Sequence, residues 1–361
     1  MDRLKLTTVL IGATFAGMAA LPATAQEGYF AGMDIEVVVP FAPGGATYVS
    51  AKFLEPFLER HLPGNPTVTV VDRPGGGSIL GANWFEENAN ADGSTVLFTT
   101  SSTSNPYVLG QSEVAYDLAA YRVAYSHAFG SVIFASPGLS VESAADLPNA
   151  SSPLVYGGIS AAASDLPAIL SFEVLGLDVN SVMGFAGRGP TLLAFQRGET
   201  NIEAQFTPVY MTQVIPMIEE ETAIPVYSGG SIAEDGRLSA RDAVAPDLPS
   251  VFEVHQLIHG EDPSGIEWDA FQAIATSTYA FGLTGYLHPD APDEAVQAFA
   301  EGVAAINEDP EFIEGSREIT GGTPLMAGVD IEDDVRAALR PSDEVRAYLR
   351  ELLSEKFNVN F

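Results

Sequence analysis

The feature that most constrains the fold is a repeated unit: a β-branched run, then a glycine-rich turn, then a helical pattern. It appears first at Val37–Leu62, again at Thr67–Asn88, and again at Leu154–Gly176 and Ser181–Glu199. Strands that alternate with helices through glycine turns predict an α/β fold with mainly parallel sheets. In such sheets ligands bind beyond the carboxyl ends of the strands, which is where these turns lie.

Several elements are predicted with definite bounds. The predicted strands are Thr67–Val71, Thr95–Thr99 and Leu154–Tyr156, and helices are predicted to begin near Ala46, Ser78 and Asp165. Pro190 suits the first position of a further helix. The hydroxyl-rich segment Thr100–Asn105 is predicted to be a loop. From about Pro292, apolar residues at spacings of three and four predict helices packed on a finished core.

The amino terminus has the pattern of an export signal. Arg3 and Lys5 precede an apolar run, Leu6–Leu21, and Ala23-Thr24-Ala25 fits a small-residue cleavage site. This pattern predicts a signal peptide, residues 1–25, cut after Ala25. The alternative is an uncleaved anchor, for which the run is short. Because the chain has no cysteine, neither a lipid anchor nor a disulfide is expected, and we predict a soluble protein of the Gram-negative periplasm.

The charge balance limits the possible partners. The chain has 48 acidic and 16 basic side chains, a formal net charge of −32. The negative electrostatic field of such a chain disfavours nucleic acid and anionic membrane surfaces as partners. If the protein binds an anion, long-range attraction does not help, so dipoles at short range must hold it.

Motifs for catalysis or metal binding are weak or missing. The sequence has no G-x-S-x-G elbow, no H-E-x-x-H and no cysteine nucleophile, and "GGGSILG" fails the dinucleotide fingerprint by its spacing. We therefore predict no enzyme activity and no cofactor. His255 and His259 have the spacing of metal ligands on a helix, but such short matches often arise by chance, so no metal is predicted.

The first glycine turn has the layout of an anion-binding site. A strand, Gly44-Gly45 and a helix starting near Ala46 would aim backbone N–H groups and a helix dipole at a ligand. No lysine follows the two glycines, as a phosphate loop of the Walker type would require. The alternative is a plain glycine-rich turn between a strand and a helix.

Seven segments in order carry a family likeness. They are "VVVPFAPGGATYVSAKFLEPFLERHL" with "VTVVDRPGGGSILGANWF", "ADGSTVLFTTSS", "LVYGGISAAASDLPAILSFEVLG", "GFAGRGPTLLAFQRGETNIEAQF", "APDLPSVFEV" and "AFGLTGYLHPDAP". Together they resemble Bug/TctC-type solute receptors, the periplasmic binding components of tripartite tricarboxylate transporters. The resemblance covers nearly the whole chain after the signal peptide.

The resemblance implies a two-lobed periplasmic binding protein fold with a ligand cleft between the lobes. By analogy, residues 26–130 and 284–361 form lobe 1, and residues 131–283 form lobe 2. The chain is expected to cross between lobes near Gly130–Ser136 and Tyr279–Thr284. The family's usual ligands are small carboxylates held by backbone amides, hydroxyls and ordered water.

We predict a set of ligand-binding residues, most of them in the two turns that resemble the family's carboxylate-binding loops. From lobe 1 they are Phe41, Pro43, Gly44, Gly45, Ala46, Thr47, Tyr48, Ser101 and Ser102; from lobe 2 they are Ser160, Ala161, Ala162, Ala163, Arg188 and Thr207. Asp165 is interpreted as a helix cap. Residues 101–105 would either face the cleft or be solvated, and both alternatives stay open.

Two positions depart from the family pattern. Tyr48 stands where relatives usually carry aspartate, so the cleft loses a carboxylate and gains an aromatic wall. Arg188 stands where small residues are common; we hypothesise that it pairs with a distal carboxylate of a di- or tricarboxylate. The alternative is a solvated surface arginine.

The resemblance therefore predicts a monomeric periplasmic receptor that delivers a small organic carboxylate to the membrane permease subunits of a tripartite tricarboxylate transporter. The alternatives are a receptor that feeds a sensor kinase and a secreted hydrolase with dispersed catalytic residues.

Overall fold

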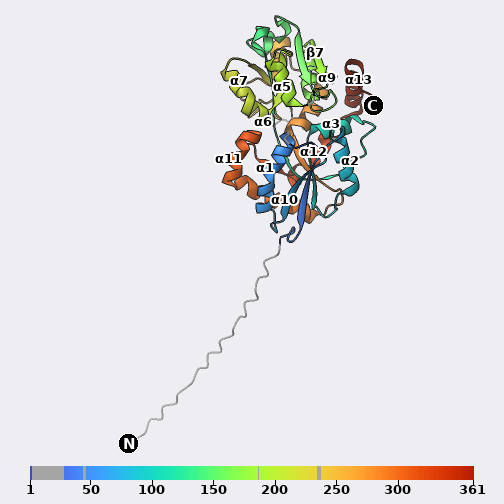
Figure 1. Ribbon diagram of the computed structural model, residues 1–361, viewed down its shortest axis with the longest axis vertical. Helices are drawn as coiled ribbons and strands as arrows, with labels where there is room; N and C mark the ends of the chain where they lie inside the picture. Colours follow the sequence, from blue (N-terminus) through green and yellow to red (C-terminus); the bar gives the residue numbers. More distant parts are fainter. Residues whose placement is uncertain (2–27, 44–45, 186, 234–236) are drawn as a thin grey trace.

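The structure is a computed structural model that describes residue 1 and residues 28–43, 46–185, 187–233 and 237–361. Figure 1 shows two lobes along the long axis, each built around its own β-sheet. The predicted signal peptide, apart from residue 1, lies outside the described residues. No helix in the described ranges is long and apolar enough to cross a membrane.

The first sheet has six strands in the order β11-β4-β10-β3-β1-β2. Its strands are β1 (Asp34–Val39), β2 (Thr67–Asp72), β3 (Thr95–Thr99), β4 (Arg122–His127), β10 (Leu283–Leu287) and β11 (Leu325–Ala327). β1 pairs in parallel with β2 and β3, whereas β10 is antiparallel to β3 and β4. The valines of β1 alternate between two buried clusters, one on each face of the sheet.

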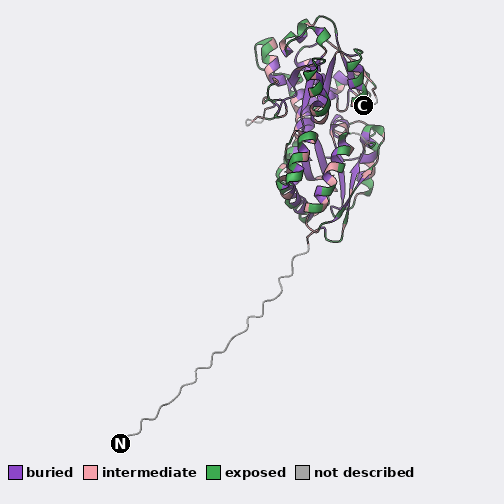
Figure 2. Ribbon diagram, turned by 60° about the vertical axis from the view of Figure 1, so that its left-hand side comes forward, coloured by how far each residue is buried: buried purple, intermediate pink, exposed green. Residues whose placement is uncertain are grey.

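Helices cover this sheet on both faces. They are α1 (Ala46–His61), η1 (Gly76–Ser78), α2 (Ile79–Asn88), α3 (Ser101–Leu109), α10 (Asp293–Glu308), α11 (Pro310–Thr320) and α12 (Gly328–Ala338). Their inward faces and the strands are buried, while their outer faces are exposed (Figure 2). The three-and-four spacing of apolar residues therefore predicted the packed face of the carboxyl-terminal helices correctly.

The second sheet has five strands in the order β7-β6-β8-β5-β9. Its strands are β5 (Ser131–Ala135), β6 (Leu154–Gly158), β7 (Val179–Met183), β8 (Ile202–Phe206) and β9 (Ile224–Ser228). The other elements are η2 (Pro137–Leu139), η3 (Ala144–Asn149), α4 (Leu166–Val174), α5 (Arg188–Gln196), α6 (Thr207–Val209), η4 (Tyr210–Val214), α7 (Ile215–Glu219), α8 (Val251–His259), α9 (Ile266–Ala275) and η5 (Thr276–Ala280).

Both sheets are mixed, so the expectation of mainly parallel sheets is wrong. β5 pairs antiparallel with both of its neighbours, as do β10 and β11 with theirs. β5 and β10 are the first strands that the chain forms after it passes from one sheet to the other. Each therefore enters its sheet from the side of the other lobe, against the direction of the neighbouring strands.

The two passages between the sheets lie side by side. The backbone N–H of Phe129, just before β5, donates to the carbonyl of Tyr279, just before β10, at 3.1 Å. The last helix, α13 (Asp343–Phe357), packs against α3 and α9 and so contacts helices that flank both sheets. Lys356 of α13 also pairs with Glu173 of α4 at 2.7 Å. The exact division of residues between lobes stays a prediction.

Some predictions of individual strands, helices and loops are confirmed, and others are wrong. Strand Thr95–Thr99 is confirmed as β3, and the starts of α1, α2 and α4 lie within one residue of their predicted positions. The loop Thr100–Asn105 is wrong: Thr100 caps α3, and Ser101–Asn105 form its first turns. Pro190 is the third residue of α5 rather than the first, where its missing N–H still costs no intrahelical bond.

Candidate functional site

The first wall of the candidate site is the turn after β1. Of the predicted ligand-binding residues here, Gly44 and Gly45 lie outside the described residues. Phe41 and Tyr48 are half-buried against the core of the first lobe. Thr47 is buried at the start of α1, whereas Pro43 and Ala46 are exposed. The aromatic wall expected from Tyr48 is therefore partly used by the core.

The second wall is the amino-terminal end of α3. The Thr100 side chain accepts from the N–H of Ser102, which starts the helix. Ser101 is buried, and its Oγ has no partner among the described residues. Ser102 is half-buried and contributes its carbonyl oxygen to the hydroxyl of Ser78. The solvated alternative is therefore wrong for most of this segment, which is buried in the protein.

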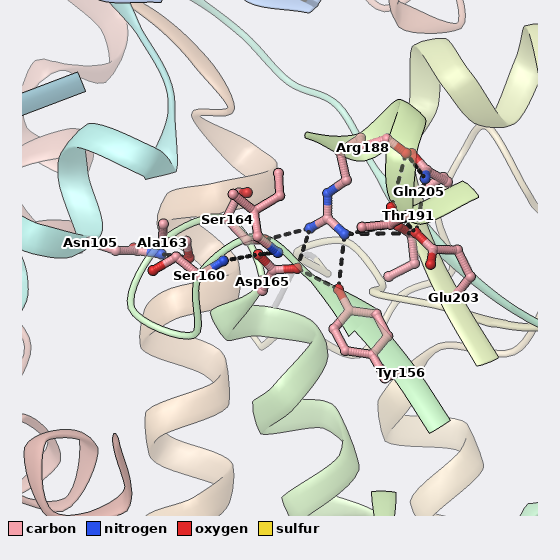
Figure 3. Close-up of polar contacts among 12 residues, drawn as sticks. Asn105, Tyr156, Ser160, Ala163, Ser164, Asp165, Arg188, Thr191, Glu203 and Gln205 are labelled. Atoms are coloured by element: carbon pink, nitrogen blue, oxygen red, sulfur yellow. Dashed lines mark hydrogen bonds and ion pairs between the residues drawn. The ribbon is translucent and has the colours of Figure 1, made fainter. Parts of the chain in front are cut away.

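One hydrogen bond joins this helix to the second lobe. The side-chain Nδ2 of Asn105 donates to the carbonyl oxygen of Ala163 at 2.8 Å. Asn105 is fully buried, and its Oδ1 has no partner in the described part of the chain. The bond brings together two segments that the sequence marked separately, residues 101–105 and the turn after β6 (Figure 3).

Asp165 holds the turn after β6 in place. Its Oδ2 accepts the backbone N–H groups of Ile159 and Ser160 at 2.9 and 3.0 Å. Its Oδ1 accepts the hydroxyl of Tyr156 at 2.7 Å and lies 3.1 Å from Nη2 of Arg188. Although Asp165 precedes α4 directly, its side chain makes no capping bond to that helix. The interpretation of Asp165 as a cap is wrong, because its carboxylate reaches back into the turn.

This arrangement decides which N–H groups of the turn are available. The N–H of Ser160 is taken by Asp165, and that of Ala163 closes the turn on the carbonyl of Ser160 at 3.1 Å. The N–H groups of Ala161 and Ala162 have no partner among the described residues, although both residues are buried. Two of the four predicted backbone donors are thus engaged within the protein, and two are available.

Arg188 lies behind this turn, at the start of α5. Nη1 donates to the hydroxyl of Tyr156 at 2.9 Å and to the carbonyl of Ala204 at 3.3 Å. Nη2 donates to the carbonyl of Ser164 at 3.3 Å as well as to Asp165. The side chain is only 14% exposed, so the alternative of a solvated arginine is wrong. With four donors engaged inside the lobe, Arg188 supports the turn from behind.

Glu203 is a second acid beside Arg188. Its Oε1 lies 3.9 Å from Nη1 of Arg188 and accepts from Thr191 Oγ1 and Gln205 Nε2, both at 2.9 Å. Its Oε2 is buried with no partner in the described chain. Burial raises the pKa of Glu203 to about 8, against the opposing attraction of Arg188. One guanidinium therefore faces two carboxyl groups, Asp165 at 3.1 Å and Glu203 at 3.9 Å.

Thr207, also predicted to bind ligand, is engaged at the crossover. Its Oγ1 accepts the N–H of Gly130 at 2.8 Å and lies 3.3 Å from the carbonyl of Gly130, to which it donates. Its own N–H also donates to that carbonyl at 3.1 Å. These bonds fix the start of β5 against the end of β8, so the described contacts of Thr207 are structural.

The histidine pair is confirmed to share α8, with ring centroids 4.5 Å apart. His255 Nδ1 donates to the carbonyl of Glu261 at 2.9 Å, and His259 Nε2 donates to that of Leu175 at 3.2 Å. In the described ranges no group of three side chains is suited to hold a metal ion.

Sequence reasoning missed Tyr156 and Glu203. One signal was present: in "IEAQF", Ile202–Phe206, polar residues alternate with apolar ones inside a strand. Such alternation predicts one polar face. It does not reveal that Arg188 covers that face.

Comparisons with known proteins agree with this architecture. No family model matches the chain. Protein BugT of Bordetella pertussis is 35% identical over 112 residues, which are 31% of this chain and 32% of BugT. The match thus spans about a third of the length of this curated relative.

Solved structures match over nearly the whole chain. The periplasmic binding protein BugD superposes with a TM-score of 0.59 at 17% identity, covering 90% of this chain and 97% of BugD. Rpa4515 of R. palustris, solved with adipate, gives a TM-score of 0.61 at 20% identity and the same coverage. The fold is that of periplasmic binding proteins, and the resemblance to the Bug/TctC receptors is confirmed.

Proposed function

We propose that this chain, which has the fold of the Bug/TctC receptors, captures a small organic carboxylate between its lobes and delivers it to a tripartite tricarboxylate transporter. The observation that carries the proposal is the pair of N–H groups at Ala161 and Ala162, which have no partner among the described residues. They belong to the turn whose Ala163 carbonyl accepts from Asn105 of the other lobe.

A carboxylate suits these donors. A buried N–H without a partner costs about 1–3 kcal/mol, so a turn of this kind gains by meeting an acceptor. Hydrogen bonds to an ionised acceptor are about twice as strong as those between neutral groups. A chain with a formal net charge of −32 attracts no anion from afar, so local dipoles are the means by which it would hold one.

The first lobe offers complementary donors. The buried hydroxyl of Ser101 has no described partner and lies in the first turn of α3. The first turns of α1 and α3 add the positive ends of their helix dipoles. A ligand with acidic groups at both ends would use both lobes and favour their closure, a hinge motion. Because Rpa4515 was solved with adipate, the probes we choose are adipate, glutarate and succinate.

Arg188 enters this proposal as a support for the turn. Its charge is matched by Asp165 at 3.1 Å, so the ligand would be held without a free cation. Direct contact between Arg188 and a distal carboxylate remains the second form of the proposal, with Nε, which has no described partner, as the available donor.

Thermal-shift measurements with the three dicarboxylates test the proposal. A ligand at one hundred times its dissociation constant should stabilise the protein by about 2.7 kcal/mol. Ser101→Ala should weaken binding several-fold, whereas Ser264→Ala, which removes a hydroxyl from an exposed loop, should not. Failure of every organic acid in a wider panel to stabilise the chain would overturn the proposal, and turnover of a ligand would favour the hydrolase.

Export and delivery are separate parts of the proposal. The predicted cut after Ala25 would place the mature chain in the periplasm, which amino-terminal sequencing of the exported protein tests. Genes for large and small membrane subunits beside this one would favour transport over feeding a sensor kinase.

A further inference from the structure

The starting observation is an uneven distribution of hydrogen bonds on Glu203. This side chain is fully buried in β8. Oε1 accepts from Thr191 and Gln205, whereas Oε2 has no partner in the described chain. A buried charge without partners costs far more than a buried neutral group. Because Oε2 lacks a partner, this environment favours the protonated acid over the carboxylate.

Three ionisable side chains face Glu203 from the surrounding elements. Arg188 comes from α5, Tyr156 from β6 and Asp165 from the turn before α4. Arg188 is the only cation among them and lies between the two acids, 3.1 Å from Asp165 and 3.9 Å from Glu203. Its single charge matches one carboxylate, and the shorter distance assigns it to Asp165 (Figure 3).

The position of Arg188 matters because Asp165 organises the turn. Asp165 holds the N–H groups of Ile159 and Ser160, and Arg188 holds the carbonyl of Ser164. These contacts enclose the N–H groups of Ala161 and Ala162. If the guanidinium moved toward Glu203, its distances to Asp165 and to the carbonyl of Ser164 would increase. Both contacts of Arg188 with the turn would then weaken.

We propose that Glu203 is a positioning residue that must keep its proton for the turn to hold its ligand-binding shape, so that loss of this proton draws Arg188 away from Asp165. The proposal rests on the proposed function, which it deepens by coupling capture of the carboxylate to protonation inside the second lobe. Burial, which raises the pKa of Glu203 to about 8, sets the range in which this coupling would act.

The first test is the affinity of the best of the three dicarboxylates between pH 7 and 9, where those ligands are fully ionised. If only the protonated form binds, the apparent affinity is reduced by the fraction that remains protonated. With a pKa of about 8, binding at pH 9 should be about tenfold weaker than at pH 7. Glu203→Gln, which stays neutral, should bind at pH 7 like the wild type and lose this pH dependence.

A matched control removes a carboxylate elsewhere in the same lobe. Glu199→Gln makes the same chemical change at an exposed position just after α5, and it should keep the wild-type profile. A Glu203→Gln profile that still falls tenfold would overturn the proposal, as would a flat wild-type profile.

A second readout needs no ligand and so separates this proposal from the proposed function. Hydrogen exchange of residues 159–165 is compared between wild type and Glu203→Gln at the same pH. The two should match at pH 7, and the wild type should exchange faster at pH 9. If wild type and Glu203→Gln exchanged at equal rates at pH 7 and also at pH 9, the role of Glu203 would be overturned, whether or not any carboxylate binds. If no carboxylate bound but the expected difference in exchange were observed, only the proposed function would be overturned.

Discussion

The Nδ2 of Asn105 lies 2.8 Å from the carbonyl oxygen of Ala163, and this bond joins α3 of the first lobe to the turn after β6 of the second. Asn105 is fully buried, whereas Ala163 is partly exposed. The bond therefore favours the arrangement in which α3 and the turn after β6 lie against each other.

Asn105→Ala should shift the protein toward an open arrangement. A hydrogen bond of this kind contributes about 1 kcal/mol, so ligand affinity should fall roughly fivefold as the competent population falls. Calorimetry gives the affinity, and small-angle scattering the shape. Asn83→Ala is the matched control, because Asn83 donates to the carbonyl of Glu113 within the first lobe. Equal affinities for wild type and Asn105→Ala would contradict the role given to this bond.

Arg188→Ala should destabilise the second lobe strongly. The substitution leaves Asp165 buried without its cation, and removing one partner of a buried ion pair costs about 3–5 kcal/mol. Urea denaturation measures the decrease in the free energy of unfolding. Arg197→Ala removes an exposed arginine directly after α5 and should change stability by less than about 0.5 kcal/mol. If Arg188→Ala were as stable as wild type yet bound ligand weakly, Arg188 would contact the ligand rather than support the turn.

The sequence was informative where local patterns decide the structure. The valines before Pro40 predict β1, and the glycine turns predict helix starts to within one residue. Asp165 shows the limit of such reasoning. Aspartate is a strong cap by local preference, but here N–H groups five and six residues earlier and Arg188 compete for the same carboxylate.

The prediction of a loop at the hydroxyl-rich residues 100–105 was wrong for a related reason. Serine, threonine and asparagine favour turns because their side chains compete for backbone groups. In Ser101–Asn105 these side chains are mostly buried against other elements, and Thr103 bonds Ser78 at 2.8 Å. Tertiary packing thus overrides the local preference. The contact between Glu203 and Arg188 likewise depends on how α5 lies on the sheet, which no spacing in the sequence encodes.

His127 should make stability depend on pH between about 4 and 6.5. The ring is buried in β4 and donates from Nε2 to the carbonyl of Thr323 at 2.6 Å. Burial lowers the pKa of His127 to about 4. The unfolded chain then binds the proton more readily than the folded chain, so the contribution is fully present above pH 6.5 and is lost as pH falls toward 4.

The expected loss over this range is ~3 kcal/mol for this one group. Unfolding free energies of wild type and His127→Gln, measured from pH 7 to pH 4, isolate it from other titrating groups. The difference between the two proteins should move in favour of the variant as the pH falls. A constant difference would show that the folded and unfolded chains bind this proton equally.

Gly130 is the crossover residue with the least space for a side chain. A Cβ at this position would lie 1.5 Å from Oδ2 of the buried Asp242. Gly130→Ala must therefore displace Asp242 or the crossover itself, an overpacking cost of typically 1–3 kcal/mol. Gly189→Ala is the control, because nothing described lies within 4 Å of a Cβ there. In a helix that change should be neutral or stabilise by up to ~1 kcal/mol.

The double variant Gly130→Ala with Asp242→Ala separates the steric explanation from a need for backbone freedom. Removing the Asp242 carboxylate opens the space into which the new methyl group projects. Because the two sites are in direct contact, their effects should not add. Thermal unfolding of the four proteins in this cycle should show that Gly130→Ala costs much less when Asp242 is already alanine. An unchanged cost would mean that the crossover needs glycine for its backbone conformation, independently of the contact with Asp242.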